Sequence, residues 1–317
     1  MLVVLLPAAY LLLAAAFWRG CGGRRAALVW AALTFAALLF ALTEGLSRFV
    51  GLTTTSTAIA WLAVVVVLAV IVWRWRPRAQ PPAPVQLDRM EWGMLALLDV
   101  FLAILTVIAL AAPPNTYDSL TYHMSRVMHW VQNGSVDFYP TAVTRQLYQH
   151  PLAEYGILHL QLLAGTDQFA NLIQLAAYAL GMAAVSLITR ELGGKTRAQI
   201  VSAVLFGTLP MAILQATSTA TDLVTALWVA VFVWFCLRGI RSGLTWPVIL
   251  GVGMSLGLAL TTKGTAYVFV TPFALWLGVA AILRHSVRAM LYGAVIIVVA
   301  LMFPLAHFTR NLAASGS

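Results

Sequence analysis

The side chains best suited to chemistry lie in one polar segment, residues 113–166, which separates long apolar runs. The first helix expected there carries a polar stripe made of Asp118, Tyr122, Arg126 and His129. Successive members are three or four residues apart, so they share one helix face. A carboxylate there can accept a proton and a guanidinium can hold an anion. The same stripe is also typical of an ordinary interfacial helix whose polar face meets water and lipid headgroups.

End signals frame two helices in this segment. Asn115 or Thr116 can cap the start of the first helix, and Gly134 can end it. A second helix, LAEYGILHLQLLA, follows Pro151 and ends at Gly165. We expect both helices to lie in the membrane interface, over the ends of the apolar runs.

Four of the six histidines also fall in this segment, which raises the question of a metal site. Their spacing fits no known ligand motif, and two cysteines far apart in the chain form neither a disulfide framework nor a thiolate site. The sequence therefore names no metal ligands and no certain cofactor, and it leaves a divalent metal open. These histidines are His123, His129, His150 and His159.

The elements that must position these groups are membrane helices. The chain is 62% hydrophobic and only 9% charged, with a mean hydropathy of +0.90, whereas soluble domains carry about 25% charged residues. Backbone groups in lipid must be paired within the segment, so the apolar runs are helices and the fold class is all-α, polytopic, with about ten spans. The expected spans are Leu2–Trp18, Ala26–Leu42, Thr57–Trp73, Gly93–Ala112, Phe169–Ile188, Ala198–Ile213, Asp222–Leu237, Val248–Thr262, Thr265–Leu283 and Ala289–Phe308.

Basic residues predict the orientation. Of the 19 lysines and arginines, 14 fall in one set of loops, which the positive-inside rule places in the cytoplasm. The N-terminus and residues 113–166 are then outside, where most of the acidic residues also lie. The net charge of +9 is accounted for by this asymmetry, so we predict no nucleic-acid partner. We predict a multi-pass protein of the plasma membrane, of the bacterial inner-membrane type, with its active face outside.

The order of the runs divides the chain into three parts. Residues 1–73 form an N-terminal three-span unit, and residues 74–92 form a proline-rich cytoplasmic linker. Residues 93–317 form the region that carries the loop 113–166. Because the chain stops soon after its last span, we expect it to be part of a longer protein.

Four runs together resemble one family. They are NTYDSLTYHM, YQHPLAEYGILHL, TATDLVTALWVAVFVWF and LALTTKGTAYVFVTPF. Over about residues 110–285 the chain resembles the polytopic glycosyltransferases of the GT-C superfamily, of the protein mannosyltransferase and lipid A aminoarabinose transferase type. The resemblance implies transfer of a sugar from a polyprenyl-phosphate donor to a glycan, lipid or protein acceptor at the outer face of the bilayer.

The resemblance also implies roles for single residues. Asp118 matches the catalytic acid at the start of the first outer loop, and we assign it as general base. A positive charge near the leaving phosphate would stabilise it, and Lys263 is the single lysine expected on that side. Many relatives carry a second acid next to the first, where this chain has Ser119. The metal-binding acid of some members is replaced here by Gln149 or shifted to Glu154, which is why a metal is left open. The further candidates for binding donor or acceptor are Asp222, Glu154, Arg126, Arg145, Tyr122 and His150.

Two other functions fit the sequence less well. A transporter or lipid flippase would place ionisable groups near the middle of the bilayer, whereas here they gather at its outer face. An inactive membrane scaffold is the third reading, because the second acid is missing.

Overall fold

The computed structural model describes residues 2–18, 20, 23–74, 85–285 and 287–315, and in these ranges the chain is helical without any strand. The all-α fold class is confirmed. Most of the predicted linker 74–92 lies outside the described residues. The α-helices are α1 Leu5–Trp18, α2 Arg24–Phe49, α3 Thr54–Arg74, α4 Arg89–Ala111, α5 Met124–Asn133, α6 Arg145–Tyr148, α7 Leu152–Ala164, α8 Leu172–Glu191, α9 Thr196–Gly207, α10 Pro210–Gln215, α11 Asp222–Ser242, α12 Trp246–Thr262, α13 Ala266–His285, α14 Val287–Leu301 and α15 Leu305–Ser315.

Six of the described helices are long and apolar enough to cross a membrane, and a bent pair would make a seventh. The pair is α14 and α15, which meet at an angle of 58°. Helices α1 and α12 are apolar but shorter. The expected span Ala198–Ile213 is broken between α9 and α10, where Pro210 starts a new helix, because proline lacks the N–H that a continuing helix needs. The chain is therefore polytopic, and six or seven of its described helices are long enough to cross a membrane.

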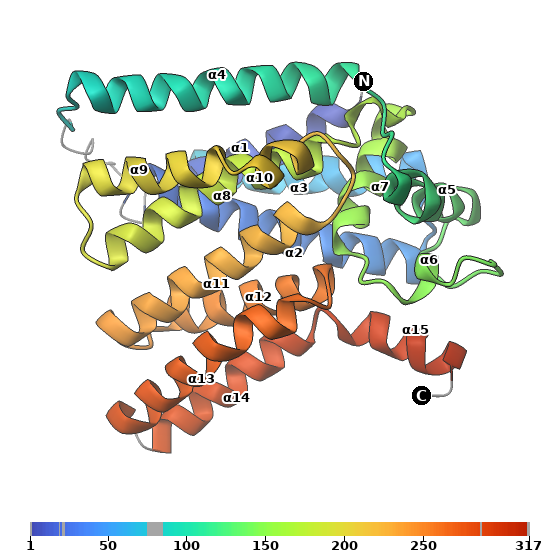
Figure 1. Ribbon diagram of the computed structural model, residues 1–317. Helices are drawn as coiled ribbons and strands as arrows, with labels where there is room; N and C mark the ends of the chain where they lie inside the picture. The colour runs from blue at the N-terminus through green and yellow to red at the C-terminus, as the bar shows by residue number, and fades with distance from the viewer. Residues whose placement is uncertain (1, 19, 21–22, 75–84, 286, 316–317) are drawn as a thin grey trace.

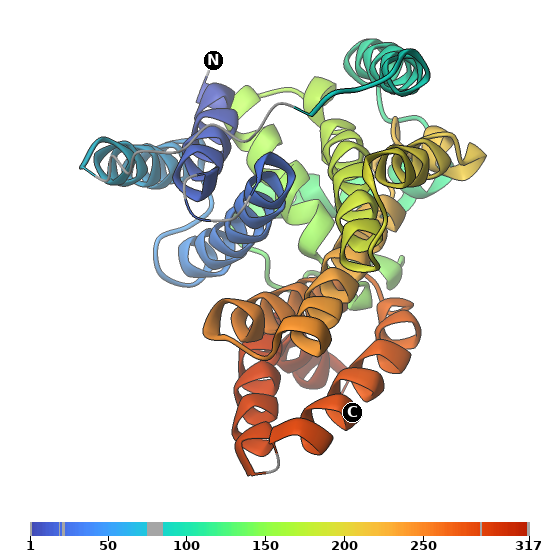
Figure 2. The same cartoon turned by 90° about the vertical axis from the view of Figure 1, so that its left-hand side faces the viewer.

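Helix α11 lies at the centre of the bundle. It packs against α8, α12 and α13, and 13 of its 21 residues are buried. In contrast, only 17% of the most apolar stretch of α3 or α4 is buried, so these helices present apolar side chains outward. Figure 2, seen along the bundle, shows α8 and α11 between the N-terminal helices and the α12–α14 group. The first three helices join the rest through α2, which packs against α7, α8 and α12, and through α3, which packs against α7.

Close packing of α12 fixes the chain that leads to Lys263. A Cβ on Gly257 would lie 2.5 Å from the backbone oxygen of Ala300 on α14, and one on Gly251 would lie 2.5 Å from the ring of Phe235 on α11. Small residues let membrane helices approach this closely. The end of α12 is thus held firmly against both neighbours.

Residues 113–166 gather at one end of the bundle, together with α15, which we call the loop end (Figure 1). The predicted helix ends are confirmed: Thr116 Oγ1 accepts a hydrogen bond from the Ser119 amide at 3.2 Å, and Gly134 and Gly165 end their helices in left-handed conformation. Between the cap and α5 the chain makes a π-helical turn, Ser119–His123.

Helix α7 corrects one expectation. It was expected to lie in the interface, yet 11 of its 13 residues are buried, and it packs against α2, α3, α5, α8 and α12. Its polar side chains can enter the interior because they find partners. His159, for example, is bonded to Trp61 Nε1 at 2.7 Å and to Thr43 Oγ1 at 2.9 Å.

The orientation can be tested with exposed single cysteines at opposite ends of the bundle. Ala142 lies at the loop end, and Thr245 lies between α11 and α12 at the other end. In cells whose protein has Cys21 replaced by alanine, an impermeant maleimide is expected to label Ala142→Cys from outside and Thr245→Cys only after permeabilisation. Cys236 is buried and should stay silent. Equal labelling of both positions in intact cells would contradict the orientation.

Candidate active site

Asp118 lies half-buried in the first helical turn after Thr116, at the loop end. The helix start places partial positive charge near its carboxylate. Tyr122 lies one turn later, close enough for its phenol to interact with Asp118. Burial raises the pKa of Tyr122, and the hydrogen bond and charge of Asp118 raise it further. Tyr122 therefore stays protonated and can donate to the carboxylate of Asp118.

Ser119 ties this turn to the start of α11. Its Oγ accepts a hydrogen bond from Thr219 Oγ1 at 2.7 Å and lies 2.6 Å from Thr116 Oγ1. These three hydroxyl groups form a hydrogen-bonded chain that joins the Asp118 turn to the residues before α11. The same connection leads directly to Asp222, the first residue of α11.

Asp222 and Lys263 form an ion pair, with Lys263 Nζ 2.7 Å from Asp222 Oδ1. The two side chains are 49% and 32% exposed. Lys263 follows the last turn of α12, and the next residue, Gly264, faces His150: a Cβ on Gly264 would lie 3.7 Å from His150 Cε1. The turn after α12 therefore lies against the loop that precedes α7.

Glu154 is fully buried beside a histidine and an arginine. Its Oε1 lies 2.8 Å from His123 Nδ1 and 3.3 Å from Arg126 Nη1, while Oε2 has no hydrogen-bond partner among the described residues. Burial disfavours the ionised carboxylate, but the hydrogen bond and charge of His123 and the charge of Arg126 outweigh it and lower the pKa of Glu154. Glu154 is accordingly an anion at neutral pH.

Arg126, for which the sequence suggested binding of phosphate or sugar, is buried and hydrogen-bonded to groups of the protein itself. Its side chain is only 1% exposed, and Nη2 donates to the carbonyls of Leu147 and Gln149 at 2.9 and 2.6 Å. Nε donates to the carbonyl of Gln146. With four of its N–H bonds directed at these carbonyls and at Glu154, the guanidinium fixes the loop before α7.

His150 sits at the end of that loop with its Nε2 buried and unpartnered among the described residues. Burial and the nearby charge of Arg126 lower its pKa, so the ring is neutral at neutral pH. A neutral imidazole with a free Nε2 can donate or accept a hydrogen bond. Its neighbours include Tyr267, His307 and Phe308, whose ring centroids lie 5.6–6.3 Å away.

The contacts thus connect the residues that the sequence selected. Arg145 is exposed, with its guanidinium 6.0 Å from the centre of the Tyr122 ring. His129 and His159 lie apart from this group: His129 stacks on Tyr139, and His159 is bonded to Trp61. In the described part of the chain, no three His, Cys, Asp or Glu side chains are close enough to hold a metal.

An apolar cavity of about 530 Å³ extends from α7 along the bundle. It lies among α1, α2, α7, α8 and α11, and residues such as Ala36, Ile173 and Trp228 line it. Leu152, Ala153 and Gly156 of α7 also line it, on either side of Glu154 in the sequence. One helix therefore serves both the polar group at the loop end and the apolar cavity.

Comparison with known proteins gives one match. Residues 149–308, just over half of the chain, match the model of the family described as dolichyl-phosphate-mannose-protein mannosyltransferase. No curated protein and no solved structure matches the chain. The matched part contains His150, Glu154, Asp222 and Lys263, whereas Asp118 precedes it. The chain belongs to the dolichyl-phosphate-mannose-protein mannosyltransferase family and is a membrane glycosyltransferase of the GT-C type.

Proposed function

We propose that the chain transfers a sugar from a polyprenyl-phosphate carrier to an acceptor hydroxyl at the loop end, which faces the outside of the cell. The observation that carries this proposal is the connected arrangement of Asp118, the Asp222–Lys263 pair and His150. Family membership favours a transferase over the transporter or flippase reading.

In the proposed reaction Asp118 is the general base. Its carboxylate takes the proton of the acceptor hydroxyl as the oxygen attacks the anomeric carbon of the sugar. The bond between that carbon and the phosphate oxygen breaks, and the lipid phosphate leaves with the electron pair. The donor bond of Tyr122 holds the carboxylate in place without supplying a competing negative charge. A positioned base contributes about 10²–10⁴-fold to such a step.

Lys263 stabilises the departing phosphate in this proposal. Its present partner, Asp222, is half exposed, and exposed ion pairs contribute only about 0.2–1 kcal/mol. Lys263 can therefore exchange this carboxylate for a lipid phosphate with only a small loss of ion-pair free energy. Arg145, exposed beside Tyr122, is a second cation at the same end.

The apolar cavity supports a lipid-carried donor. It is lined almost entirely by hydrocarbon side chains and reaches α7 next to the polar group. Burying one CH₂ group contributes about 0.8 kcal/mol, so an isoprenoid chain placed there would be held strongly. The phosphate at the head of that chain would then meet the loop end.

Lys263→Met is expected to weaken binding of farnesyl phosphate about tenfold, because an exposed ammonium loses only part of its Coulomb attraction to solvent screening. Binding is measured by calorimetry on the protein in phosphatidylcholine nanodiscs.

Two control variants separate phosphate binding from structural effects. Asp222→Asn frees Lys263, so it should leave the affinity unchanged or raise it. Lys195→Met, just before α9 at the opposite end of the bundle, should have no effect. If Lys263→Met bound farnesyl phosphate as the parent does, the phosphate site would have to be sought at Arg145.

A further inference from the structure

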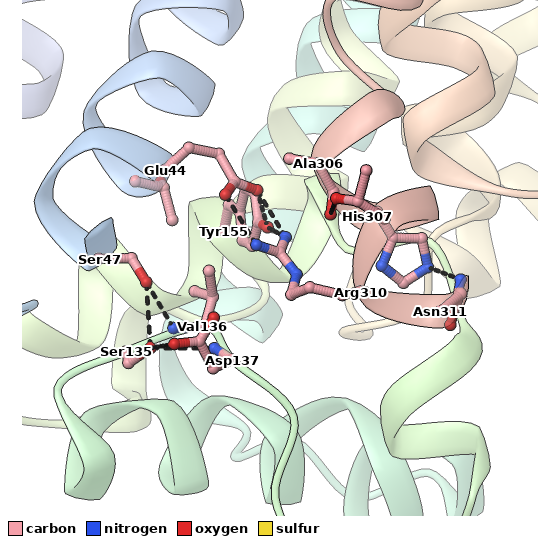
Figure 3. A network of polar contacts seen from close by, with 12 residues as sticks. Glu44, Ser47, Ser135, Val136, Asp137, Tyr155, Ala306, His307, Arg310 and Asn311 are labelled. Carbon is pink, nitrogen blue, oxygen red and sulfur yellow. Dashed lines mark hydrogen bonds and ion pairs between the residues drawn. The ribbon is translucent and has the colours of Figure 1, made fainter. Parts of the chain in front are cut away.

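A second cavity, of about 450 Å³, lies at the loop end. It is lined by the end of α2, by the loop after α5 and by α15: Glu44, Gly45, Ser47, Arg48, Phe49, Asp137, Ala306, Thr309 and Arg310. Figure 3 shows the polar side chains around it. Its volume is in the range of about 300–1,000 Å³ that small-molecule sites occupy. None of its lining residues belongs to the proposed donor site.

One wall of this cavity contains Glu44 and Arg310, whose side chains form a rigid hydrogen-bonded group with Tyr155 of α7. Arg310 of α15 binds both carboxylate oxygens of Glu44 on α2, at 2.7 and 2.8 Å. The phenol of Tyr155 on α7 donates to Glu44 at 2.6 Å and accepts from Arg310 at 2.9 Å. A bidentate pair has a fixed geometry, so this wall is organised before any ligand arrives. Figure 3 shows the three groups converging.

The opposite wall is made of hydroxyl groups and a carboxylate. Ser47 Oγ accepts a hydrogen bond from the Val136 amide at 3.0 Å and lies 3.2 Å from Ser135 Oγ. Ser135 Oγ in turn donates to Asp137 Oδ2 at 2.8 Å. These bonds tie α2 to the loop after α5, and Ser47 and Asp137 both line the cavity.

The charges around the cavity balance. Two carboxylates, Glu44 and Asp137, face two guanidinium groups, Arg48 and Arg310. Because Glu44 already neutralises Arg310, the cavity offers little net attraction to a phosphate or another anion. Carboxylates that accept and guanidinium groups that donate suit a neutral ligand with many hydroxyl groups, since each hydroxyl both donates and accepts.

Phe49 provides an exposed aromatic ring beside these charged groups. Its side chain lies at the rim of the cavity and is 83% exposed. The face of an aromatic ring carries negative potential, and the C–H face of a sugar ring packs well against it. An exposed aromatic ring beside paired carboxylate and guanidinium groups is the chemistry that recognises a saccharide.

We propose that this cavity binds a neutral saccharide, and that this saccharide is the sugar portion of the acceptor. The second half of the proposal rests on the transferase function proposed above. Tyr155, which is hydrogen-bonded to the cavity residues Glu44 and Arg310, follows Glu154 directly. Helix α15 places Arg310 in the cavity and His307 beside His150. Helix α15 therefore borders both sites, and an acceptor held by its sugar in the cavity lies next to the donor site.

The test measures saccharide binding without the transfer reaction. The full chain is placed in phosphatidylcholine nanodiscs, free of sugar detergents, and saturation-transfer NMR is recorded with glucose, mannose, galactose and N-acetylglucosamine. At least one sugar is expected to bind. Phe49→Leu keeps an apolar side chain at the interface but removes the ring, and it should weaken that binding at least tenfold. Phe49→Trp should retain it.

Three more variants complete the design. Asp137→Asn, at the opposite wall, should also weaken binding, whereas Trp73→Leu, an exposed aromatic residue at the far end of α3, should not. Asp118→Asn should bind the sugar normally, which separates this site from the transfer chemistry.

Three results would overturn the proposal: no sugar binding at tens of millimolar, binding that is equal in the parent and in Phe49→Leu, or binding of inorganic phosphate in place of sugar. Sugar binding that depends on Phe49 in a protein without transfer activity would instead retain the site and refute the transferase role.

Discussion

Asp118→Asn is expected to lower sugar transfer about 100-fold or more and to leave the fold intact. Asparagine has the shape of aspartate, and its side-chain oxygen can still accept the hydrogen bond of Tyr122. The helix start and the Thr116 cap do not involve the Asp118 side chain. The change therefore removes the basic site alone, and the acceptor hydroxyl must lose its proton without help.

The measurement is release of lipid phosphate from a polyprenyl-phosphate sugar, with the parent and variant compared in nanodiscs at equal folded content. Asp167→Asn is the matched control, because Asp167 is an exposed acid in the first turn of another short helix at the loop end. It should transfer normally. Near-parental activity of Asp118→Asn would exclude a general-base role and leave the base to be found elsewhere at the loop end.

The helices were predictable because a local run of apolar residues is enough to predict a membrane helix. Each expected span coincides with one helix or with one pair of helices in the structure. The breaks within these apolar runs were harder to predict from the sequence. Hydropathy continues across Pro210 and across the 58° bend between α14 and α15, so a window that averages apolar character reads through both. Composition indicates that a segment is apolar, while its bends depend on backbone bonds and on neighbouring helices.

The burial of α7 could not be predicted for a related reason. Its polar residues looked like an interfacial face, yet Glu154 and His159 are paired with Arg126, His123, Thr43 and Trp61, which lie 28–116 residues away in the chain. Only a fold that brings these partners together makes the burial of such groups tolerable.

Within the candidate site, residue types were easier to predict than partners. The sequence selected Asp222 and Lys263 for a ligand, but their mutual ion pair joins residues 41 apart. His123 was considered only as a metal ligand, because a regular helix places it off the polar stripe. The π-helical turn widens the helix there, and Ser119, Tyr122 and His123 are all buried. Such wide turns occur frequently at functional sites, although no sequence signal marked this one.

Arg126→Met is expected to destabilise the folded protein by about 3–5 kcal/mol, the typical loss when one partner of a buried ion pair is removed. Two losses act together. Glu154 would remain as a buried anion with His123 alone beside it, and the carbonyls of Gln146, Leu147 and Gln149 would lose their donor. Reversible unfolding in mixed micelles, followed by tryptophan fluorescence, would measure the change.

A second substitution separates these two losses. Arg126→Met with Glu154→Gln removes the unpaired anion but leaves the carbonyls without a donor, so it should recover part of the lost stability and not all of it. The pH dependence should also differ. The pKa of Glu154 is lowered in the folded protein, so its ionised form contributes stability that is complete above the ordinary value near 4.5 and is lost as the pH falls through the folded pKa.

Glu154→Gln alone should remove that acid-dependent component. If Arg126→Met were as stable as the parent, Arg126 could not be the residue that holds the loop before α7. The sequence-based role for it, contact with phosphate or sugar, would then return as the better explanation. The predicted loss is large because the guanidinium is sealed from water, so no solvent molecule can replace the donors that the loop carbonyls and Glu154 share.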